Sequence, residues 1–441
     1  MARVPVSGND RQGTPFYHEV VPKELREMLP DSEPFKAYMV HAMQAAPVSP
    51  QYHAAVALTL AATELARMGY RLNRQPLMLW TVLVGPPVDG KSSAMRHGLD
   101  FMRKLWNGLG IYQETSEPII QCDESSIPGL LHEFYQHHDY KQHTTPGLFY
   151  ANEMSRLFGK SEPVWETLVQ LMDGNTIVRQ LRELQNARKR DKDVPDRIVN
   201  PRASAMMATT LPAIAPYFNK SMKIGGFFAR FWWVPGQAKR EYMAHWLDDI
   251  DIEPTRKVAD LAWRQWLSSL TVLHATDKVL QTTEEAQAIL RDEVWNPVLD
   301  LRGDEYDENP DDGIRHRAAL RTRVLAGLYA LLSGRTEIQP DDMHRAGKLT
   351  WRAISDALGA ASLVGDDEIT RLARRAERMI RQAGKQGLPR HMLSKRLNIR
   401  ADQRNQVTQT LLDRGVIHQA QSEGAGSETY IHTDHYDHFD A

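Results

Sequence analysis

A continuous apolar segment, residues 77–84, runs directly into residues 85–93, which read G-P-P-V-D-G-K-S-S. Such an apolar run is typical of a parallel strand that is buried on both faces of a sheet. Helical periodicity begins at Ser92 and continues to Leu105. A strand that passes through G-x-x-x-x-G-K-S into a helix aims backbone N–H groups and the positive end of the helix dipole at an anion. The segment therefore predicts a phosphate-binding loop.

Each residue of this loop has an expected place around a nucleoside triphosphate, and ATP with Mg²⁺ is the ligand we expect. The Lys91 ammonium should reach the β- and γ-phosphates, and the Ser92 hydroxyl should ligate Mg²⁺. The residues predicted to line the nucleotide are Gly85, Pro86, Pro87, Val88, Asp89, Gly90, Lys91, Ser92 and Ser93.

Short apolar segments with helical patterns between them continue after the loop. They predict strands at residues 118–122, 147–151, 203–209 and 229–234. Strands that alternate with helices indicate an α/β fold with a parallel sheet. Helical patterns precede this region at residues 22–68 and follow it at residues 257–270, 283–301, 316–332 and 340–361.

The length of 441 residues is too great for a single small core. We expect a flexible N-terminus at 1–20, an ATPase core with an N-terminal helical collar at 21–240, a helical module at 241–365, a winged helix-turn-helix at 366–433 and a tail at 434–441. The winged helix is predicted from three helical segments followed by two strands around a glycine-rich tip.

ATP hydrolysis needs a group that orients the attacking water and a second ligand for the metal. The apolar residues 148–151 are followed by Asn152 and Glu153, so Glu153 is the favoured water-activating carboxylate and Asn152 a candidate magnesium contact. An amide brings no charge, which would weaken metal binding. Asp123 and Glu124, after the preceding strand, are the alternative pair, although Asp123 would also suit a helix N-cap.

Two further residues are candidates for contacts to the γ-phosphate. Thr209 ends the fourth predicted strand, where it would act as a sensor or simply terminate the strand. Arg230 lies on the fifth predicted strand among aromatic residues, and a buried guanidinium must find an anion. That anion is either the nucleotide of a neighbouring subunit or an internal carboxylate.

Two basic segments point to nucleic acid as a partner. Residues 179–202 carry eight basic and four acidic residues, including Arg188, Lys189 and Arg190, and lie between core strands. Residues 371–414 carry twelve basic and three acidic residues. Arg400 and Arg404 lie at the start of the expected recognition helix, where they would meet phosphates or base edges of DNA. A solvated charged insertion and a protein-binding winged helix are the respective alternatives.

Composition limits the other possibilities. The net charge of -2 excludes a uniformly basic nucleic-acid coat, and a single cysteine, Cys122, excludes a disulfide within the chain and a four-cysteine zinc site. The polar N-terminus lacks the apolar core of a signal peptide, and no apolar run is long enough to span a bilayer. We expect a cytoplasmic protein without a membrane partner.

Several segments in order resemble a family of uncharacterised RecA/DnaB-like ATPases of phages, plasmids and integrated elements, often called primase-helicases. The resemblance covers roughly residues 20–360. It rests on the helical entry at residues 21–25, the phosphate loop, residues 123–128, Asn152-Glu153-Met154, residues 172–174, Gly226 with residues 229–231, and the helix with Arg321 and residues 326–330. The resemblance implies a RecA-like core that assembles into homo-oligomers or rings, with ATP between subunits and Arg230 acting in trans. Asn152 departs from the usual aspartate, a change that would affect turnover rather than nucleotide binding. The chain shows no primase zinc ribbon or carboxylate cluster.

Two functions fit these features. The first is a nucleic-acid-dependent helicase or translocase driven by ATP hydrolysis. The second is a nucleotide-gated DNA-binding regulator or adaptor that does not translocate. The basic insertion favours the first function, and Asn152 favours the second.

Overall fold

The structure is a computed structural model. It describes residues 16–73, 75–110, 119–121, 145–158, 164–174, 177–178, 197–198, 201–214, 227–236, 251–273, 278–300, 315–363, 368–421 and 428–435. The chain divides into two compact units, residues 1–361 and 362–441.

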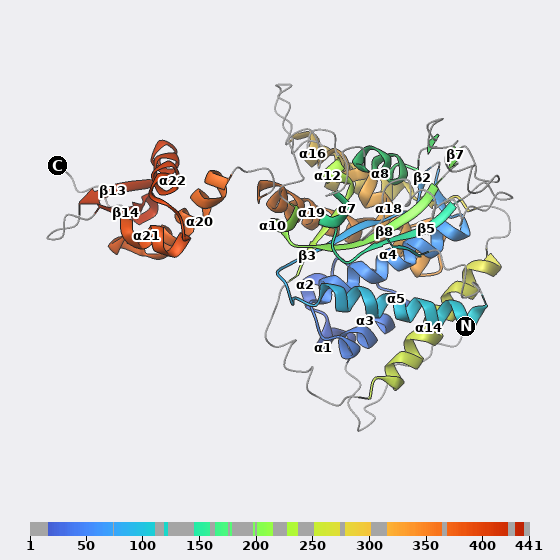
Figure 1. Cartoon of the computed structure of the whole chain (residues 1–441). Coiled ribbons are helices and arrows are strands. Elements are labelled where there is room, and N and C mark those ends of the chain that lie inside the picture. Colours follow the sequence, from blue (N-terminus) through green and yellow to red (C-terminus); the bar gives the residue numbers. More distant parts are fainter. Residues whose placement is uncertain are drawn as a thin grey trace. The chain divides into compact units, whose positions relative to one another are not determined.

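The larger unit is built around a five-stranded parallel sheet (Figure 1). Its strands lie in the order β4-β5-β8-β3-β9, so β8 separates β3 from β5. Their bounds are β3 Trp80–Val84, β4 Ile119–Gln121, β5 Thr145–Ala151, β8 Pro201–Thr209 and β9 Trp232–Pro235. All neighbouring pairs run parallel, which confirms the predicted α/β class.

Helix α4 (Pro50–Met68) lies across one face of this sheet and contacts β3, β5, β8 and β9. It is rich in alanine and leucine and is buried along almost its whole length, because a helix that is apolar on all sides must be enclosed by other elements. Helices α3 (Glu33–Ala45) and α5 (Lys91–Leu109) pack against α4, and α14 (Glu253–Leu273) packs against α3 and α5. Figure 1 shows α4 and α5 on one side of the sheet and α8 (Val164–Met172) on the other.

The helices after residue 250 share the core of the sheet. Trp263 of α14, Tyr329 of α18 (Ala318–Leu332) and Leu349 of α19 (Pro340–Leu363) belong to the same buried cluster as Leu83 of β3. The predicted helical module and ATPase region are thus joined by one hydrophobic core. The remaining short elements of this unit are α1 Tyr17–Val20, α2 Lys23–Arg26, β1 Arg71–Leu72, β2 Gln75–Pro76, α7 Ser155–Phe158, β6 Ile177–Val178, β7 Arg197–Ile198, α10 Leu211–Ile214, α12 Phe227–Arg230, β10 Gln281–Thr282, α15 Glu284–Ile289, η3 Leu290–Trp295, α16 Asn296–Asp300 and β11 Glu337–Ile338.

The smaller unit has a hydrophobic core of its own, which includes Ala376, Leu393, Val407 and Tyr430. Its helices are α20 Glu368–Gln382, α21 Arg390–Leu397 and α22 Ala401–Asp413, with short turns η4 Gly384–Gln386 and η5 Thr433–His435. Strands β12 Leu388–Pro389, β14 Glu428–His432 and β13 Ile417–Gln421 form an antiparallel sheet in that order. Three helices and a two-stranded ribbon were predicted here, and β12 was not.

One predicted strand is partly wrong. Residues 227–230 form the short helix α12, and only residues 232–235 are extended, so Arg230 lies on a helix and not on a strand. A contact from a distant helix stabilises the end of α12: the Arg321 Nη2 atom donates to the carbonyl oxygens of Ala229 and Phe231, at 2.7 and 2.9 Å, and so satisfies backbone acceptors that a helix end leaves unpaired. The N-terminal segment predicted to be flexible also ends earlier than residue 20, because α1 begins at Tyr17.

Among the described residues, no helix is both long enough and apolar enough to cross a membrane.

Candidate nucleotide site

The phosphate loop connects the end of β3 with the start of α5. Helix α5 begins at Lys91, immediately after Gly90, whose φ of 80° lies in the left-handed region. A Cβ atom on Gly90 would also lie 2.1 Å from Cγ1 of Val48, so this position requires glycine for two reasons. Val88, at φ 67°, is also left-handed and is 86% exposed at the tip of the loop. The loop therefore has the strand–turn–helix context that the sequence predicted.

Lys91 is buried and lies across its own loop. The Lys91 Nζ atom donates to the carbonyl oxygens of Gly85 and Pro86, at 2.8 and 2.6 Å. Burial lowers the pKa of Lys91, while the charges of Asp89 and Glu153 act in the opposite direction. The ammonium is thus held at the edge of the sheet, between the loop and the strand end that carries Glu153.

The loop is also fixed from α4, through Tyr52. The Tyr52 hydroxyl lies 2.8 Å from the carbonyl oxygen of Val84 and 2.5 Å from Oδ2 of Asp89. A Cβ atom on Gly85 or on Gly236 would come within 2.4 and 2.0 Å, respectively, of that hydroxyl. Burial raises the pKa of Tyr52, and the hydrogen bond to Asp89 raises it further. Tyr52 therefore ties the base of the loop to the helix beneath the sheet.

Glu153 and Thr209 meet at the ends of neighbouring strands. The Thr209 hydroxyl donates to Oε1 of Glu153 at 2.9 Å, and the Ser155 hydroxyl donates to the same oxygen at 2.9 Å. Thr209 is also the register partner of Val84, the last residue before the phosphate loop. The carboxyl ends of β3, β5 and β8 thus bring Lys91, Glu153 and Thr209 to one edge of the sheet.

Asn152 lies beside this group. Its Oδ1 atom accepts a hydrogen bond of 2.8 Å from the Tyr150 hydroxyl. The chain offers an amide oxygen at this place where a carboxylate would bind a cation more strongly. The described residues contain no cluster of three or more histidine, cysteine, aspartate or glutamate side chains suited to a metal ion.

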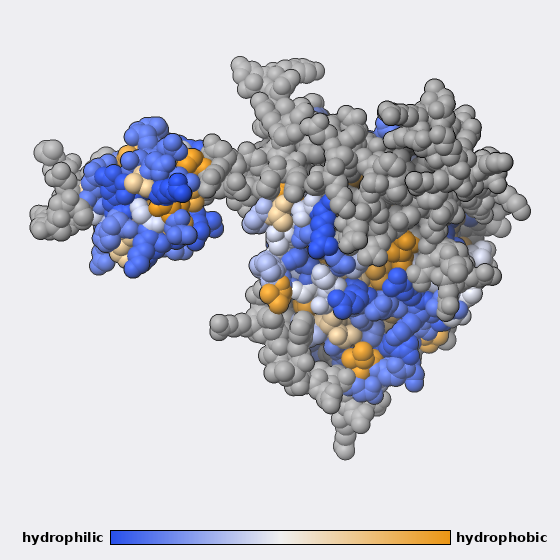
Figure 2. All heavy atoms as spheres, in the orientation of Figure 1, coloured by the Kyte–Doolittle hydropathy of each residue, from blue (hydrophilic) through white to orange (hydrophobic). Residues whose placement is uncertain are grey.

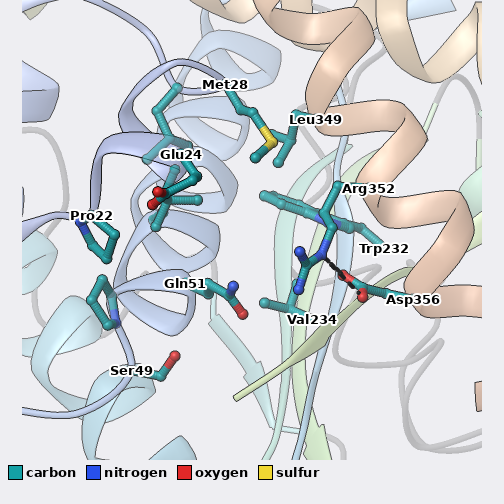
Figure 3. Close-up of a pocket in the computed structure, with 14 residues that line it drawn as sticks. Pro22, Glu24, Met28, Ser49, Gln51, Trp232, Val234, Leu349, Arg352 and Asp356 are labelled. Atoms are coloured by element: carbon teal, nitrogen blue, oxygen red, sulfur yellow. Dashed lines mark hydrogen bonds and ion pairs between the residues drawn. The ribbon is translucent and has the colours of Figure 1, made fainter. Parts of the chain in front are cut away.

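A pocket of 210 Å³ lies along β9, on the side of β3 that faces away from β8 and Glu153 (Figure 3). Gln51 of α4 and Trp232 and Val234 of β9 face it. Arg352 and Asp356 of α19 line it as an ion pair at 3.2 Å. The pocket adjoins the phosphate loop. Val48, which precedes the lining residue Ser49, lies so close to Gly90 that a Cβ atom there would clash with it, and Tyr52, which follows the lining residue Gln51, hydrogen-bonds Asp89.

Arg230 lies at the opposite edge of the sheet, before the start of β9. Its Nε and Nη2 atoms donate to the two carboxylate oxygens of Asp173, at 2.9 and 2.6 Å. The structure therefore shows the internal carboxylate partner that was one of the two sequence-based alternatives. Arg230 lies near the amino ends of the strands, whereas the phosphate loop follows the carboxyl end of β3. The two are therefore separated by the length of β3, about 16 Å.

Of the predicted nucleic-acid contacts, Arg400 and Arg404 lie at the start of α22. Arg400 is exposed, whereas Arg404 donates to the side chains of Ser394 and Asn405. Exposed basic residues Lys395 and Arg396 lie nearby at the end of α21. The part of this unit seen in Figure 2 is mostly hydrophilic. Arg188, Lys189, Arg190, Asp123 and Glu124 lie outside the described residues.

Sequence patterns did not reveal Tyr52 or the pocket along β9. Tyr52 lies inside an apolar helical run, where a tyrosine indicates only packing. The pocket collects residues that are up to about 330 positions apart in the sequence, and no local pattern joins them.

No protein-family model matches this chain, and no curated protein matches it. Among solved structures, the chain is similar to one described as a full-length MCM homolog from Methanopyrus kandleri, with a TM-score of 0.37 and 15% sequence identity. The match covers 76% of this chain and 62% of that chain, so it spans less than two thirds of the other protein.

Proposed function

We propose that this chain binds ATP with Mg²⁺ at residues 85–93 and hydrolyses it to drive a helicase-like or translocase-like action on nucleic acid, as the resemblance to phage and plasmid RecA/DnaB-like ATPases implies. The observation that carries the proposal is the placement of buried Lys91 in the first turn of α5, at the same sheet edge as the hydrogen-bonded pair Glu153 and Thr209.

Each residue at this edge has a role in the proposal. Lys91 exchanges its two carbonyl contacts for β- and γ-phosphate oxygens, while the helix start supplies backbone N–H groups. Ser92 ligates Mg²⁺, with Asn152 behind a metal-bound water. Glu153 orients the attacking water, and the hydroxyls of Thr209 and Ser155 hold its carboxylate in place. Asp123 and Glu124 remain the alternative carboxylates.

The pocket along β9 is proposed to take the base of the nucleotide. It lies on the side of β3 away from Glu153 and next to the phosphate loop, so a triphosphate in the loop would extend its nucleoside toward it. Trp232, Met28 and Leu349 offer apolar surface, and the Gln51 amide is a donor and acceptor for ring nitrogens.

Nucleic acid and a second copy of the chain are the proposed partners. Arg400, with Lys395 and Arg396, forms an exposed basic edge at the predicted recognition helix, which suits contacts to DNA phosphates. Arg230 is too far from its own phosphate loop to contact that nucleotide. Any contact with a γ-phosphate would have to be made in trans, in a homo-oligomer or ring.

One observation favours the second candidate function, a nucleotide-gated DNA-binding regulator without translocation. Asn152 offers no charge to the metal and is engaged by Tyr150. An ATPase with weakened turnover would use nucleotide binding chiefly to set its assembly state.

Measurements of ATP hydrolysis and strand displacement with single-stranded DNA test the proposal and separate the two functions. A motor is expected to show DNA-stimulated hydrolysis together with displacement. If both are absent while ATP still changes the native mass, the regulator describes the protein and the motor is refuted.

Two substitutions test the site itself. Lys91→Ala should abolish nucleotide binding, whereas Lys104→Ala, on an exposed position of the same helix, should not. Glu153→Gln should retain binding and lower turnover by about 10²–10⁴-fold. Normal turnover in Glu153→Gln, with loss in Asp123→Asn or Glu124→Gln, would move the catalytic role to that pair.

A further inference from the structure

Three segments far apart in the sequence meet at the sheet edge opposite the phosphate loop. Asp173 follows the last residue of α8, Arg230 ends α12, and Arg317 and Arg321 lie at the start of α18. Each segment contributes to the resemblance to RecA/DnaB-like ATPases, but no sequence pattern places the three together. The structure joins them into one polar cluster.

A single carboxylate links two of the three arginines. Asp173 accepts the bidentate hydrogen bonds of Arg230, and its Oδ1 atom also pairs with Nη1 of Arg317 at 3.2 Å. The arginine charges lower the pKa of Asp173, although burial opposes them. Asp173 is therefore ionised and carries one negative charge against three positive charges.

Arg321 does not share this carboxylate. Its Nη2 atom donates to two backbone carbonyls, whereas Nη1 is buried and has no hydrogen-bond partner among the described residues. Burial, together with the charge of Arg317, lowers the pKa of Arg321 to about 10. The pKa of Arg317 is lowered as well, by burial and by the charge of Arg230. A buried guanidinium donor without an acceptor is costly.

The cluster opens onto a cavity of 70 Å³. The cavity is lined by Arg230, Arg317 and Arg321 together with apolar side chains that include Met78, Trp80 and Trp232. One water molecule needs about 10–15 Å³ of such space, so the cavity admits several waters or one small polyatomic ion. Guanidinium groups bind tetrahedral oxyanions through paired N–H donors more strongly than they bind water.

We propose that Arg317, Arg321 and Arg230 form a binding site for a phosphate-type oxyanion, for which the Asp173 carboxylate competes from within the chain. The site is distinct from the phosphate loop, since β3 lies between them. Two sources supply this chemistry, a free phosphate ion and the terminal phosphate of a nucleotide held by a second copy of the chain.

Inorganic phosphate is the probe for the first source, measured by calorimetric titration of the Lys91→Ala protein, in which the phosphate loop is disabled. Lys91→Ala/Asp173→Asn should bind phosphate about tenfold more tightly than Lys91→Ala, because the competing charge is removed. Adding Arg317→Gln should weaken binding about tenfold. Arg264→Gln is the matched control, a partly exposed arginine in an ion pair with Asp260 on α14, and should change nothing.

Nucleotide retention tests the second source, and this arm alone rests on the proposed function. Arg317→Gln should release ATP about tenfold faster from the assembled protein, and mixing with Lys91→Ala subunits, which carry an intact cluster, should restore retention. Failure of ATP to bind at all would refute the nucleotide site while leaving the phosphate titration valid. The oxyanion site is refuted if no Lys91→Ala variant binds phosphate and Arg317→Gln retains nucleotide like Arg264→Gln.

Discussion

Tyr52 offers the sharpest test of how the α/β core holds its phosphate loop. Its hydroxyl is shared by the carbonyl of Val84, at the end of β3, and the carboxylate of Asp89, inside the loop. Tyr52→Phe removes this hydroxyl and leaves the ring, which is fully buried, in place. The substitution therefore isolates the polar contact from the packing of the side chain.

The expected loss follows from the two partners. A hydrogen bond to a charged group contributes about 1.5–3 kcal/mol. Asp89 is only half-buried, so water replaces part of the lost contact, and the lower end of about 1.5 kcal/mol applies. If the loop must keep this conformation to bind phosphates, the same energy corresponds to about tenfold weaker nucleotide affinity.

A double-mutant cycle measures the contact. The unfolding free energies of the wild type, Tyr52→Phe, Asp89→Ala and the double variant should give a coupling energy of about 1–2 kcal/mol. Tyr70→Phe is the control. Its hydroxyl bonds the carbonyl of Leu270, away from the loop, so it should lower stability but leave ATP affinity unchanged. Additive effects of Tyr52→Phe and Asp89→Ala, or equal ATP affinity of the two tyrosine variants, would refute this account of the loop.

Three further predictions concern other parts of the molecule. Burial lowers the pKa values of three neighbouring histidines, to about 4 for His41 and about 3 for His53 and His97. Below pH 6.5 these histidines take up protons in the unfolded chain but not in the folded chain. The unfolding free energy should therefore be full above that pH and fall by about 1.4 kcal/mol per histidine at pH 5.5. Equal urea midpoints at pH 7.5 and 5.5 would contradict this. Arg400→Ala should weaken DNA binding and reduce the slope of log K against log salt by about one, and an unchanged slope would remove Arg400 from the interface. Glu64 is fully buried and accepts hydrogen bonds from Arg67 and Trp106. Glu64→Ala should therefore lower the unfolding free energy by about 3–5 kcal/mol in denaturant titrations. A loss below about 1 kcal/mol would show that the ion pair of Glu64 with Arg67 is dispensable.

Local patterns predicted the phosphate loop because all of its determinants are adjacent in the sequence. The apolar strand, the glycines that permit a left-handed turn and the start of α5 fall within residues 77–105. The carboxyl ends of parallel strands share an edge, so Thr209 and Glu153 could also be expected near Lys91. Their direct hydrogen bond could not, since it depends on the register of β5, β8 and β3.

Arg230 shows where local reasoning failed. Its aromatic neighbours predicted a strand, but residues 227–230 form a helix. A guanidinium on α18, about 90 residues further along, binds the carbonyls on either side of Arg230 and stabilises the end of that helix. The sequence left two kinds of anion open for Arg230. The structure shows Asp173, a residue that no spacing rule connects to it.

The sequence by itself determined the class of the fold and the place of the phosphate loop, because strand, turn and helix propensities act over a few residues. Tertiary structure alone decided which distant residues meet. It formed the hydrogen bond between Tyr52 and Asp89, the pocket along β9, and the contacts of Asp173 with Arg230 and Arg317. These contacts join residues that lie tens to hundreds of positions apart. Their energies depend on burial and distance, which exist only once the chain has folded.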